Sequence, residues 1–179
     1  GHLPDAPVDL AFQADALPAP TFGGKATVTR VTAGCTVKGK SFSFPFYAAI
    51  PTAEGKHPFF VHINFRPEVA DYYQPIEEII DNGFAVLSFC YNDVTQDNHD
   101  LTDGLAGILY ENGIRGPEDP GKIALWAWAA QRVMDYAETR QDVLDLDCAV
   151  VCGHSRLGKT ALLAAATDDN PTAGSILKK

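Results

Sequence analysis

The sequence has 179 residues, of which 46% are apolar, and a formal net charge of −9. This length suits one soluble domain with a buried core. The acidic balance argues against nucleic acid as a partner, because phosphate binding needs a basic face. No run of about eighteen apolar residues occurs, so we expect no membrane span. The first ten residues lack the basic start and apolar centre of a signal peptide, although a mature secreted chain would look the same, so the localisation stays open between cytoplasm and secretion.

The N-terminal part is expected to be extended. Residues 1–24 are rich in Pro, Ala and Asp and end in two glycines, which is typical of an arm or loop. Residues 25–34 and 41–51 alternate β-branched or aromatic residues with polar ones, which predicts two half-exposed strands. The short connection between them predicts a β hairpin or a meander.

The rest of the chain alternates buried strands with helices. Three apolar segments predict buried strands, at residues 57–65, 83–91 and 145–153. Helices are expected at residues 75–81, 120–139 and 155–167, the second of them starting at Asp119-Pro120. This order predicts an α/β fold with a mostly parallel sheet, right-handed crossovers and an N-terminal β hairpin. We expect residues 25–179 to form one domain behind the N-terminal arm.

The four cysteines show no metal-binding spacing; they are Cys35, Cys90, Cys148 and Cys152. If Cys148 and Cys152 share one strand, they lie roughly 13 Å apart, which a disulfide cannot span. We therefore expect buried free thiols. This fits a reducing compartment without establishing it.

Residues 153–160, Gly-His-Ser-Arg-Leu-Gly-Lys-Thr, match two signatures. As G-x-x-x-x-G-K-[ST] they would form a phosphate-binding loop. Three of the intervening residues are bulky, however, and no later strand ends in an Asp that would help to hold Mg²⁺. As G-x-S-x-x-G they are close to a nucleophile elbow, in which a sharp strand-to-helix turn exposes a serine. The flanking strand and helix favour the elbow, although Leu157 replaces its usual second glycine and Gly158 follows one residue late.

Residues 153–159 resemble the G-[CH]-S-R-x-G-K signature of the glucuronoyl esterases, carbohydrate esterase family fifteen, and of related bacterial esterases. Residues 121–139 and Asn64-Phe65 also resemble segments of that family, so the resemblance spans residues 25–167. It implies an incomplete α/β-hydrolase fold that ends just after the elbow helix, in a bacterial-type protein.

The resemblance also implies roles for three residues. Ser155 would be the nucleophile that attacks an ester carbonyl. Arg156 would stabilise the oxyanion through its backbone N–H and its guanidinium, and Lys159 would hydrogen-bond the hydroxyls of a uronic acid. An oxyanion does need donors that are already aimed at it. From the residues alone, a helix N-cap role for Ser155 and plain surface roles for Arg156 and Lys159 stay open.

A base for Ser155 is missing from the sequence. A serine hydroxyl needs a histidine that a carboxylate orients, and in α/β-hydrolases both follow the serine in the chain. No histidine follows Ser155, and Asp168 and Asp169 fall at the end of the expected helix. The earlier histidines are expected in other settings: His2 at the terminus, His57 in a turn, His62 in the core, His99 in a polar loop and His154 beside the serine.

That polar loop, residues 92–104, is called the acidic loop below. Its carboxylates invite comparison with a calcium site, but the glycine and the bidentate glutamate of such a site are not at the required spacing. A solvated loop is the better interpretation of its four acidic residues, Asp93, Asp97, Asp100 and Asp103. No metal or cofactor is implied.

The sequence thus predicts a serine-dependent carboxylic-ester hydrolase of the glucuronoyl esterase type, acting on plant-polysaccharide esters and inactive as this chain alone. The alternatives are an acetylxylan esterase-type hydrolase, a non-catalytic hydrolase-like module or gene remnant, and a P-loop nucleotide-binding protein. The strand at residues 145–153 would be left at a sheet edge, where an apolar strand pairs with another chain or aggregates. Besides a carbohydrate-ester substrate, we therefore expect self-association or a separate C-terminal half.

Overall fold

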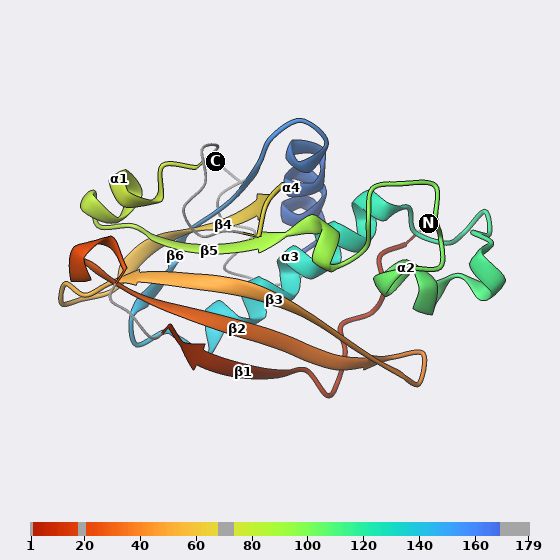
Figure 1. Ribbon diagram of the computed structural model, residues 1–179, viewed down its shortest axis with the longest axis horizontal. Helices are drawn as coiled ribbons and strands as arrows, with labels where there is room; N and C mark the ends of the chain where they lie inside the picture. The colour runs from red at the N-terminus through yellow and green to blue at the C-terminus, as the bar shows by residue number, and fades with distance from the viewer. Residues whose placement is uncertain (1, 18–20, 68–73, 169–179) are drawn as a thin grey trace.

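The computed structural model describes residues 2–17, 21–67 and 74–168. Its centre is a six-stranded sheet in the order β1-β2-β3-β5-β4-β6 (Figure 1). The strands are β1 (Ala11–Ala16), β2 (Ala26–Val37), β3 (Lys40–Pro51), β4 (His57–Asn64), β5 (Ala85–Cys90) and β6 (Leu144–Gly153). The segment expected to be an extended arm therefore contains an edge strand, β1.

The described residues also form four α-helices and three short 3₁₀ helices. The α-helices are α1 (Ile76–Asp81), α2 (Gly104–Leu109), α3 (Lys122–Glu138) and α4 (Arg156–Thr167). The 3₁₀ helices are η1 (Phe22–Gly24), η2 (Tyr91–Asp93) and η3 (Glu111–Gly113). The expected helices at residues 75–81, 120–139 and 155–167 correspond to α1, α3 and α4, whereas α2 was not foreseen.

The α/β class is confirmed, but the expectation of a mostly parallel sheet is wrong. β1 with β2, β2 with β3, and β3 with β5 pair antiparallel. Only β4 pairs parallel, with β5 on one side and β6 on the other. Parallel neighbours need a long crossover: α1 lies on the connection from β4 to β5, and α2 and α3 lie on the connection from β5 to β6. The alternating patterns in the N-terminal part form the antiparallel half of the sheet, strands β1, β2 and β3, which has as many strands as the parallel half.

The β2–β3 hairpin closes through the two-residue turn Lys38-Gly39. Val37 pairs with Lys40, and the turn residues have φ of 47° and 74°. Two positive φ values define the tight turn whose twist matches that of paired strands. The glycine suits this conformation because it carries no Cβ.

The helices cover the two faces of the sheet unequally. The large core lies on the face that α3 and α4 cover, where Trp126, Trp128 and the β3 phenylalanines are buried. The opposite face carries a small cluster in which Ile76 and Ile80 of α1 pack against β2, β3 and β5. β5 is buried along its whole length, as its sequence, apolar except for Ser88, predicts.

Helix α3 begins two residues later than its sequence signal suggests. Gly121 is the N-cap and Lys122 the first helical residue. Asp119, the expected N-cap, instead accepts a hydrogen bond of 2.8 Å from the N–H of Gly116. The carbonyl of Pro120 accepts a hydrogen bond of 2.6 Å from the Tyr110 hydroxyl. The turn before α3 therefore uses both residues, and the helix starts behind them.

The cysteines are all free thiols, but they are not all buried. Cys35 and Cys90 are buried, Cys152 is partly buried and Cys148 is exposed. The expectation of buried thiols is therefore wrong for Cys148, which lies in the stretch of β6 where the pairing with β4 is irregular. No helix in the described ranges is both long and apolar enough to span a membrane.

Candidate active site

The turn from β6 into α4 holds Ser155 in an unusual backbone conformation. Its φ and ψ are 58° and −119°, outside the regions that residues with a Cβ normally occupy. Such a conformation costs on the order of 1–3 kcal/mol and persists only where the surroundings enforce it. The N–H of Leu157 donates to the His154 carbonyl at 3.0 Å, and that of Gly158 donates to the Ser155 carbonyl at 3.0 Å. These bonds and the fully buried Leu157 side chain hold the turn.

Two glycines allow this turn to be so tight. A Cβ on Gly153 would lie 2.5 Å from the carbonyl oxygen of Leu157. A Cβ on Gly158 would lie 3.1 Å from the carbonyl oxygen of Gly153. The close approach thus joins the end of β6 to the first turn of α4. This explains why the second glycine stands at 158, one residue later than in the general elbow pattern, while Leu157 points into the core.

The Ser155 side chain is available for chemistry. The residue is exposed, and its hydroxyl makes no capping hydrogen bond to α4. The first N–H groups of a helix lack partners within the helix, and together with the helix dipole they favour negative charge at that end. Ser155 therefore lies where a developing oxyanion would be stabilised. Its expected alternative role as a side-chain N-cap is not what the structure shows.

Arg156, the next residue, extends its guanidinium toward the acidic loop. The guanidinium forms an ion pair with the Asp97 carboxylate. Its central carbon lies 5.8 Å from the ring centroid of Phe65, which follows β4. The ring of His154 lies on the same phenylalanine, with centroids 6.3 Å apart. The carboxyl ends of β4 and β6 and the acidic loop thus meet at Arg156.

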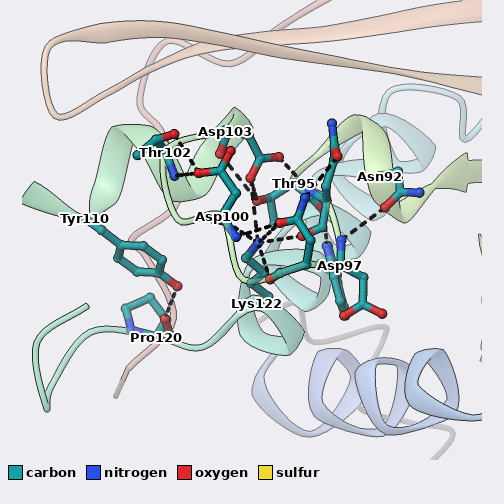
Figure 2. A network of polar contacts seen from close by, with 12 residues as sticks. Asn92, Thr95, Asp97, Asp100, Thr102, Asp103, Tyr110, Pro120 and Lys122 are labelled. Atoms are coloured by element: carbon teal, nitrogen blue, oxygen red, sulfur yellow. Dashed lines mark hydrogen bonds and ion pairs between the residues drawn. The ribbon is translucent and has the colours of Figure 1, made fainter. Parts of the chain in front are cut away.

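The acidic loop is largely exposed, but its backbone is folded around a cation. Val94 and Thr95 are fully buried, and the N–H of Gln96 donates to the Asp103 carboxylate at 2.7 Å. Figure 2 shows the Lys122 ammonium at the centre of the loop's polar contacts. The described residues contain no group of three or more His, Cys, Asp or Glu that could hold a metal ion. Asp93, Asp97 and Asp100 are exposed, as expected of a solvated loop, but a lysine from α3 organises the loop's backbone.

Lys159 lies on the exposed side of α4, one turn after Ser155. Its backbone N–H donates to the Ser155 carbonyl at 3.3 Å. The side chain is thus on the same end of the helix as Ser155 and Arg156. This position is compatible with either a substrate contact or a plain surface role.

The histidines of β4 are engaged away from Ser155. The two ring nitrogens of His57 lie 2.9 Å from the Gly83 carbonyl and 3.0 Å from the Ala53 carbonyl. His57 is the first, buried residue of β4, so the start of the strand predicted at 57–65 is confirmed and the expected turn position of His57 is wrong. His62 is a core residue, as predicted, with Nδ1 3.4 Å from the Ser88 hydroxyl. These contacts of the two histidines are made with groups other than Ser155.

Asn64, the last residue of β4, is part of the Asn64-Phe65 pair that resembles the family, but the sequence assigned no role to its amide. It is 1% exposed and lies next in sequence to Ile63, which pairs with Gly153. Its Oδ1 accepts a hydrogen bond of 3.2 Å from the N–H of Arg66, but its Nδ2 has no hydrogen-bond partner. A buried donor without a partner is costly and calls for an explanation. The signals in the sequence were the Asn64-Phe65 resemblance and a polar residue at the end of a buried strand.

A family model described as glucuronyl esterase, fungi, matches residues 33–171 of the chain. A carbohydrate esterase from an unknown prokaryotic organism is 38% identical over 95 residues, which cover 52% of this chain and 22% of that protein. The structure of a glucuronoyl esterase from Solibacter usitatus matches with a TM-score of 0.76 and 25% identity, covering 94% of this chain and 51% of that one. A glucuronoyl esterase from Teredinibacter turnerae matches with a TM-score of 0.73 and 25% identity, covering 93% and 46%. The chain therefore spans about half the length of these solved structures and less of the curated relative.

Proposed function

Because the chain belongs to the glucuronyl esterase family, we propose that it is the nucleophile-bearing half of an α/β-hydrolase that cleaves carboxylic esters of polysaccharides. Ester groups on a uronic acid are the favoured substrates, since the relatives include glucuronoyl esterases. The observation that carries this proposal is the backbone of Ser155. The backbone strain at this serine, which two closely packed glycines enforce, lowers the stability of the fold. It supports a role in nucleophilic catalysis, because a sharp turn between a strand and a helix exposes the serine hydroxyl.

The proposed reaction begins with attack of the Ser155 oxygen on the ester carbonyl carbon. The serine proton passes to a base, the carbonyl oxygen becomes an oxyanion, and loss of the alcohol leaves an acyl-enzyme that water then hydrolyses. The backbone N–H of Arg156 and its guanidinium are the donors proposed for the oxyanion. Removing one such donor in a serine hydrolase typically costs about 3 kcal/mol of transition-state stabilisation. Lys159 is the donor proposed for the hydroxyls of the sugar.

We propose that a further segment supplies the base, because the described contacts of the β4 histidines and of His154 are with groups other than the Ser155 hydroxyl. The β4 histidines are bonded to carbonyls and to Ser88, and a serine without a base is a weak nucleophile. We therefore propose that this chain alone hydrolyses esters poorly or not at all. The same observation favours the second candidate function, a non-catalytic module that uses the elbow region to bind carbohydrate.

The outer edge of β6 supports the need for a further segment. β6 ends the sheet in the described ranges, and an apolar cavity of about 350 Å³ lies beside it, lined by Val151, Cys152, Ala161 and Leu162 among others. Val150 is 36% exposed and Leu162 is 66% exposed. An exposed apolar edge is a template for another strand. We propose that a further strand covers it, from a second copy or from a separate C-terminal half.

Intact mass after incubation with a fluorophosphonate probe tests the function directly. The chain is compared with Ser155→Ala and with the matched control Ser41→Ala, which alters an exposed serine of β3. Labelling of the wild type and of the control, but not of Ser155→Ala, would support Ser155 as a nucleophile that a base activates. Untreated wild-type protein would then be assayed on a glucuronic acid methyl ester and on acetylated xylan, which separates the two esterase types.

The absence of labelling in a folded sample would leave the elbow without a base and favour the non-catalytic module. Binding of an oligosaccharide that carries methyl-glucuronate, measured by calorimetry, would then support that module. Equal labelling of Ser155→Ala would contradict Ser155 as the nucleophile altogether.

A further inference from the structure

Lys122 occupies a position that electrostatics disfavours unless something compensates. It is the first residue of α3, where the positive end of the helix dipole repels a cation. Its side chain is nevertheless only 12% exposed. A long, strongly hydrated ammonium loses both water and rotamer freedom on such burial. The acidic loop must therefore supply the interactions that keep it there.

The loop supplies them with a cage of oxygen atoms (Figure 2). The ammonium donates to the carbonyl of Gln96 at 2.6 Å and to the carbonyl of Asp100 at 2.5 Å. Both the carbonyl and the side-chain oxygen of Asn98 lie at 3.1 Å. The Asp103 carboxylate completes the cage at 3.7 Å. Convergent carbonyl dipoles repel one another, so this curled shape of the loop depends on a positive charge at its centre.

Asp97 lies between Gln96 and Asn98, two of the three residues whose carbonyls hold the ammonium. Because the carbonyls of Gln96 and Asn98 point inward to Lys122, the backbone of Asp97 between them is held in place as well. The N–H of Asp97 donates to the side-chain oxygen of Asn92 at 3.3 Å. On the same segment, the indole N–H of Trp126 donates to the carbonyl of Thr95 at 2.9 Å. Helix α3 thus holds the loop at two points on either side of the Asp97 backbone.

The Asp97 carboxylate contacts Arg156, whose guanidinium also lies over Phe65. The side chain of Arg156 is 46% exposed, and that of Asp97 is 33% exposed. An ion pair this open adds little to folding stability. Its effect is on orientation, because a free arginine side chain samples many rotamers while this one is held between a ring and a carboxylate beside Ser155.

We propose that Lys122 is the built-in cation of the acidic loop and that, through this loop, Asp97 and Lys122 position the Arg156 guanidinium beside Ser155. Asp97 and Lys122 are thus positioning residues, because neither touches the reacting atoms. The consequence for catalysis rests on the proposed function, whereas the positioning itself is a property of this chain and is measurable without activity.

The first test measures how fast phenylglyoxal modifies Arg156, followed by peptide mass mapping. Asp97→Asn keeps the size of the side chain but removes the charge that holds the guanidinium. We expect Arg156 to react up to about fivefold faster in this variant, the factor that an exposed ion pair can contribute. The matched control is Asp142→Asn, which neutralises the partner of Arg140 in an exposed pair and should leave the Arg156 rate unchanged. An unchanged Arg156 rate in folded Asp97→Asn would overturn the proposal.

The second test addresses Lys122 by hydrogen exchange of the acidic loop. Lys122→Ala empties the cage, and we expect the N–H groups of Gln96 and Asp97 to exchange several-fold faster. Added methylammonium ion should restore their protection, since it reproduces the lost charge. Lys122→Met fills the same space without charge, so methylammonium should not restore protection there. Exchange that is unchanged in Lys122→Ala, or equal rescue of both variants, would contradict a cation-organised loop.

A third measurement separates this inference from the proposed function. If the fluorophosphonate labels Ser155, we expect Asp97→Asn to label several-fold more slowly than Asp142→Asn, because the oxyanion loses an oriented donor. If nothing labels Ser155 but Arg156 reactivity responds to Asp97→Asn, the proposed function fails and the positioning stands. Equal labelling of both variants together with unchanged Arg156 reactivity would overturn the positioning while the esterase remains.

Discussion

The tight turn at residues 153–158 and the acidic loop meet at Arg156, but different forces shape them. In the turn, backbone atoms of Gly153, Leu157 and Gly158 approach so closely that no Cβ fits at its first glycine. In the loop, main-chain carbonyls from separate residues converge on the ammonium of Lys122, which comes from another element. The turn is thus shaped by local sterics and the loop by a distant charge. The two should therefore respond differently to substitution.

The largest effect is expected from Lys122→Met, which removes the charge at the centre of the loop. The Asp103 carboxylate, only 19% exposed, would lose its cation and the carbonyls their donor. Breaking a largely buried ion pair by removing one partner costs about 3 kcal/mol. We expect the urea midpoint to fall accordingly, with an unchanged slope. Lys56→Met, at an exposed lysine, is the control and should differ by less than about 0.5 kcal/mol.

The next largest effect is expected from Gly153→Ala, which tests the steric explanation of the turn. The added Cβ would lie 2.5 Å from a backbone oxygen, so the backbone itself must shift. Overpacking of this kind costs about 2 kcal/mol in the free energy of unfolding. Gly158→Ala is the matched comparison, because its contact of 3.1 Å is milder and alanine favours the helix. Equal losses in both variants would argue against the close approach at Gly153.

The sequence predicts the turn far better than the loop, and the difference in forces explains why. Glycines, a serine and flanking apolar runs at residues 145–167 are a local pattern, so the strand, the turn and the helix are visible together. Every residue has a main-chain carbonyl, so residue types do not indicate which carbonyls bind a cation. Lys122 also follows Asn98 by more than twenty residues. Neither the contacts of Lys122 nor the Asp97–Arg156 ion pair can therefore be predicted from the sequence.

In the sheet, too, local patterns are predictable from the sequence and contacts between distant segments are not. The buried strands and the β2–β3 hairpin follow from apolar patterns. The pairing of β3 with β5 joins distant segments, and with the β1–β2 pairing it makes the sheet mostly antiparallel. Edge strand β1 escaped prediction because it is short and largely exposed, so alternation along it carries little burial signal.

A smaller effect of opposite sign is expected at Ser155. Glycine tolerates a positive φ without steric conflict, so Ser155→Gly should relieve the strain of the turn and raise the free energy of unfolding by about 1 kcal/mol. Thermal unfolding at equal protein concentration measures it. Ser41→Gly, in a strand without such strain, should instead lower the stability. A loss at Ser155 as large as that at Ser41 would show that the serine side chain, and not the backbone, holds the turn.

The smallest expected effects are on the pH dependence of stability, which differs between the turn and the loop. Burial raises the pKa of the Cys152 thiol, just before the turn, to about 11 from an ordinary 9.0. Between these values the unfolded chain releases the thiol proton while the folded chain keeps it, so stability falls as pH rises. In the loop, hydrogen bonds from the Thr102 side chain and backbone lower the pKa of Asp100 below 3.8. That contribution is present above pH 3.8 and is lost as pH falls further.

Urea unfolding over a range of pH would therefore show two separate dependences. Cys152→Ser should reduce the loss of stability on the alkaline side and leave the acid side unchanged. Asp100→Asn should reduce the loss on the acid side only. If either variant altered the stability on both the acid and the alkaline side, the turn and the loop would not be independent. Arg156, which contacts both segments, would then couple the charge of Lys122 to the packing of the turn.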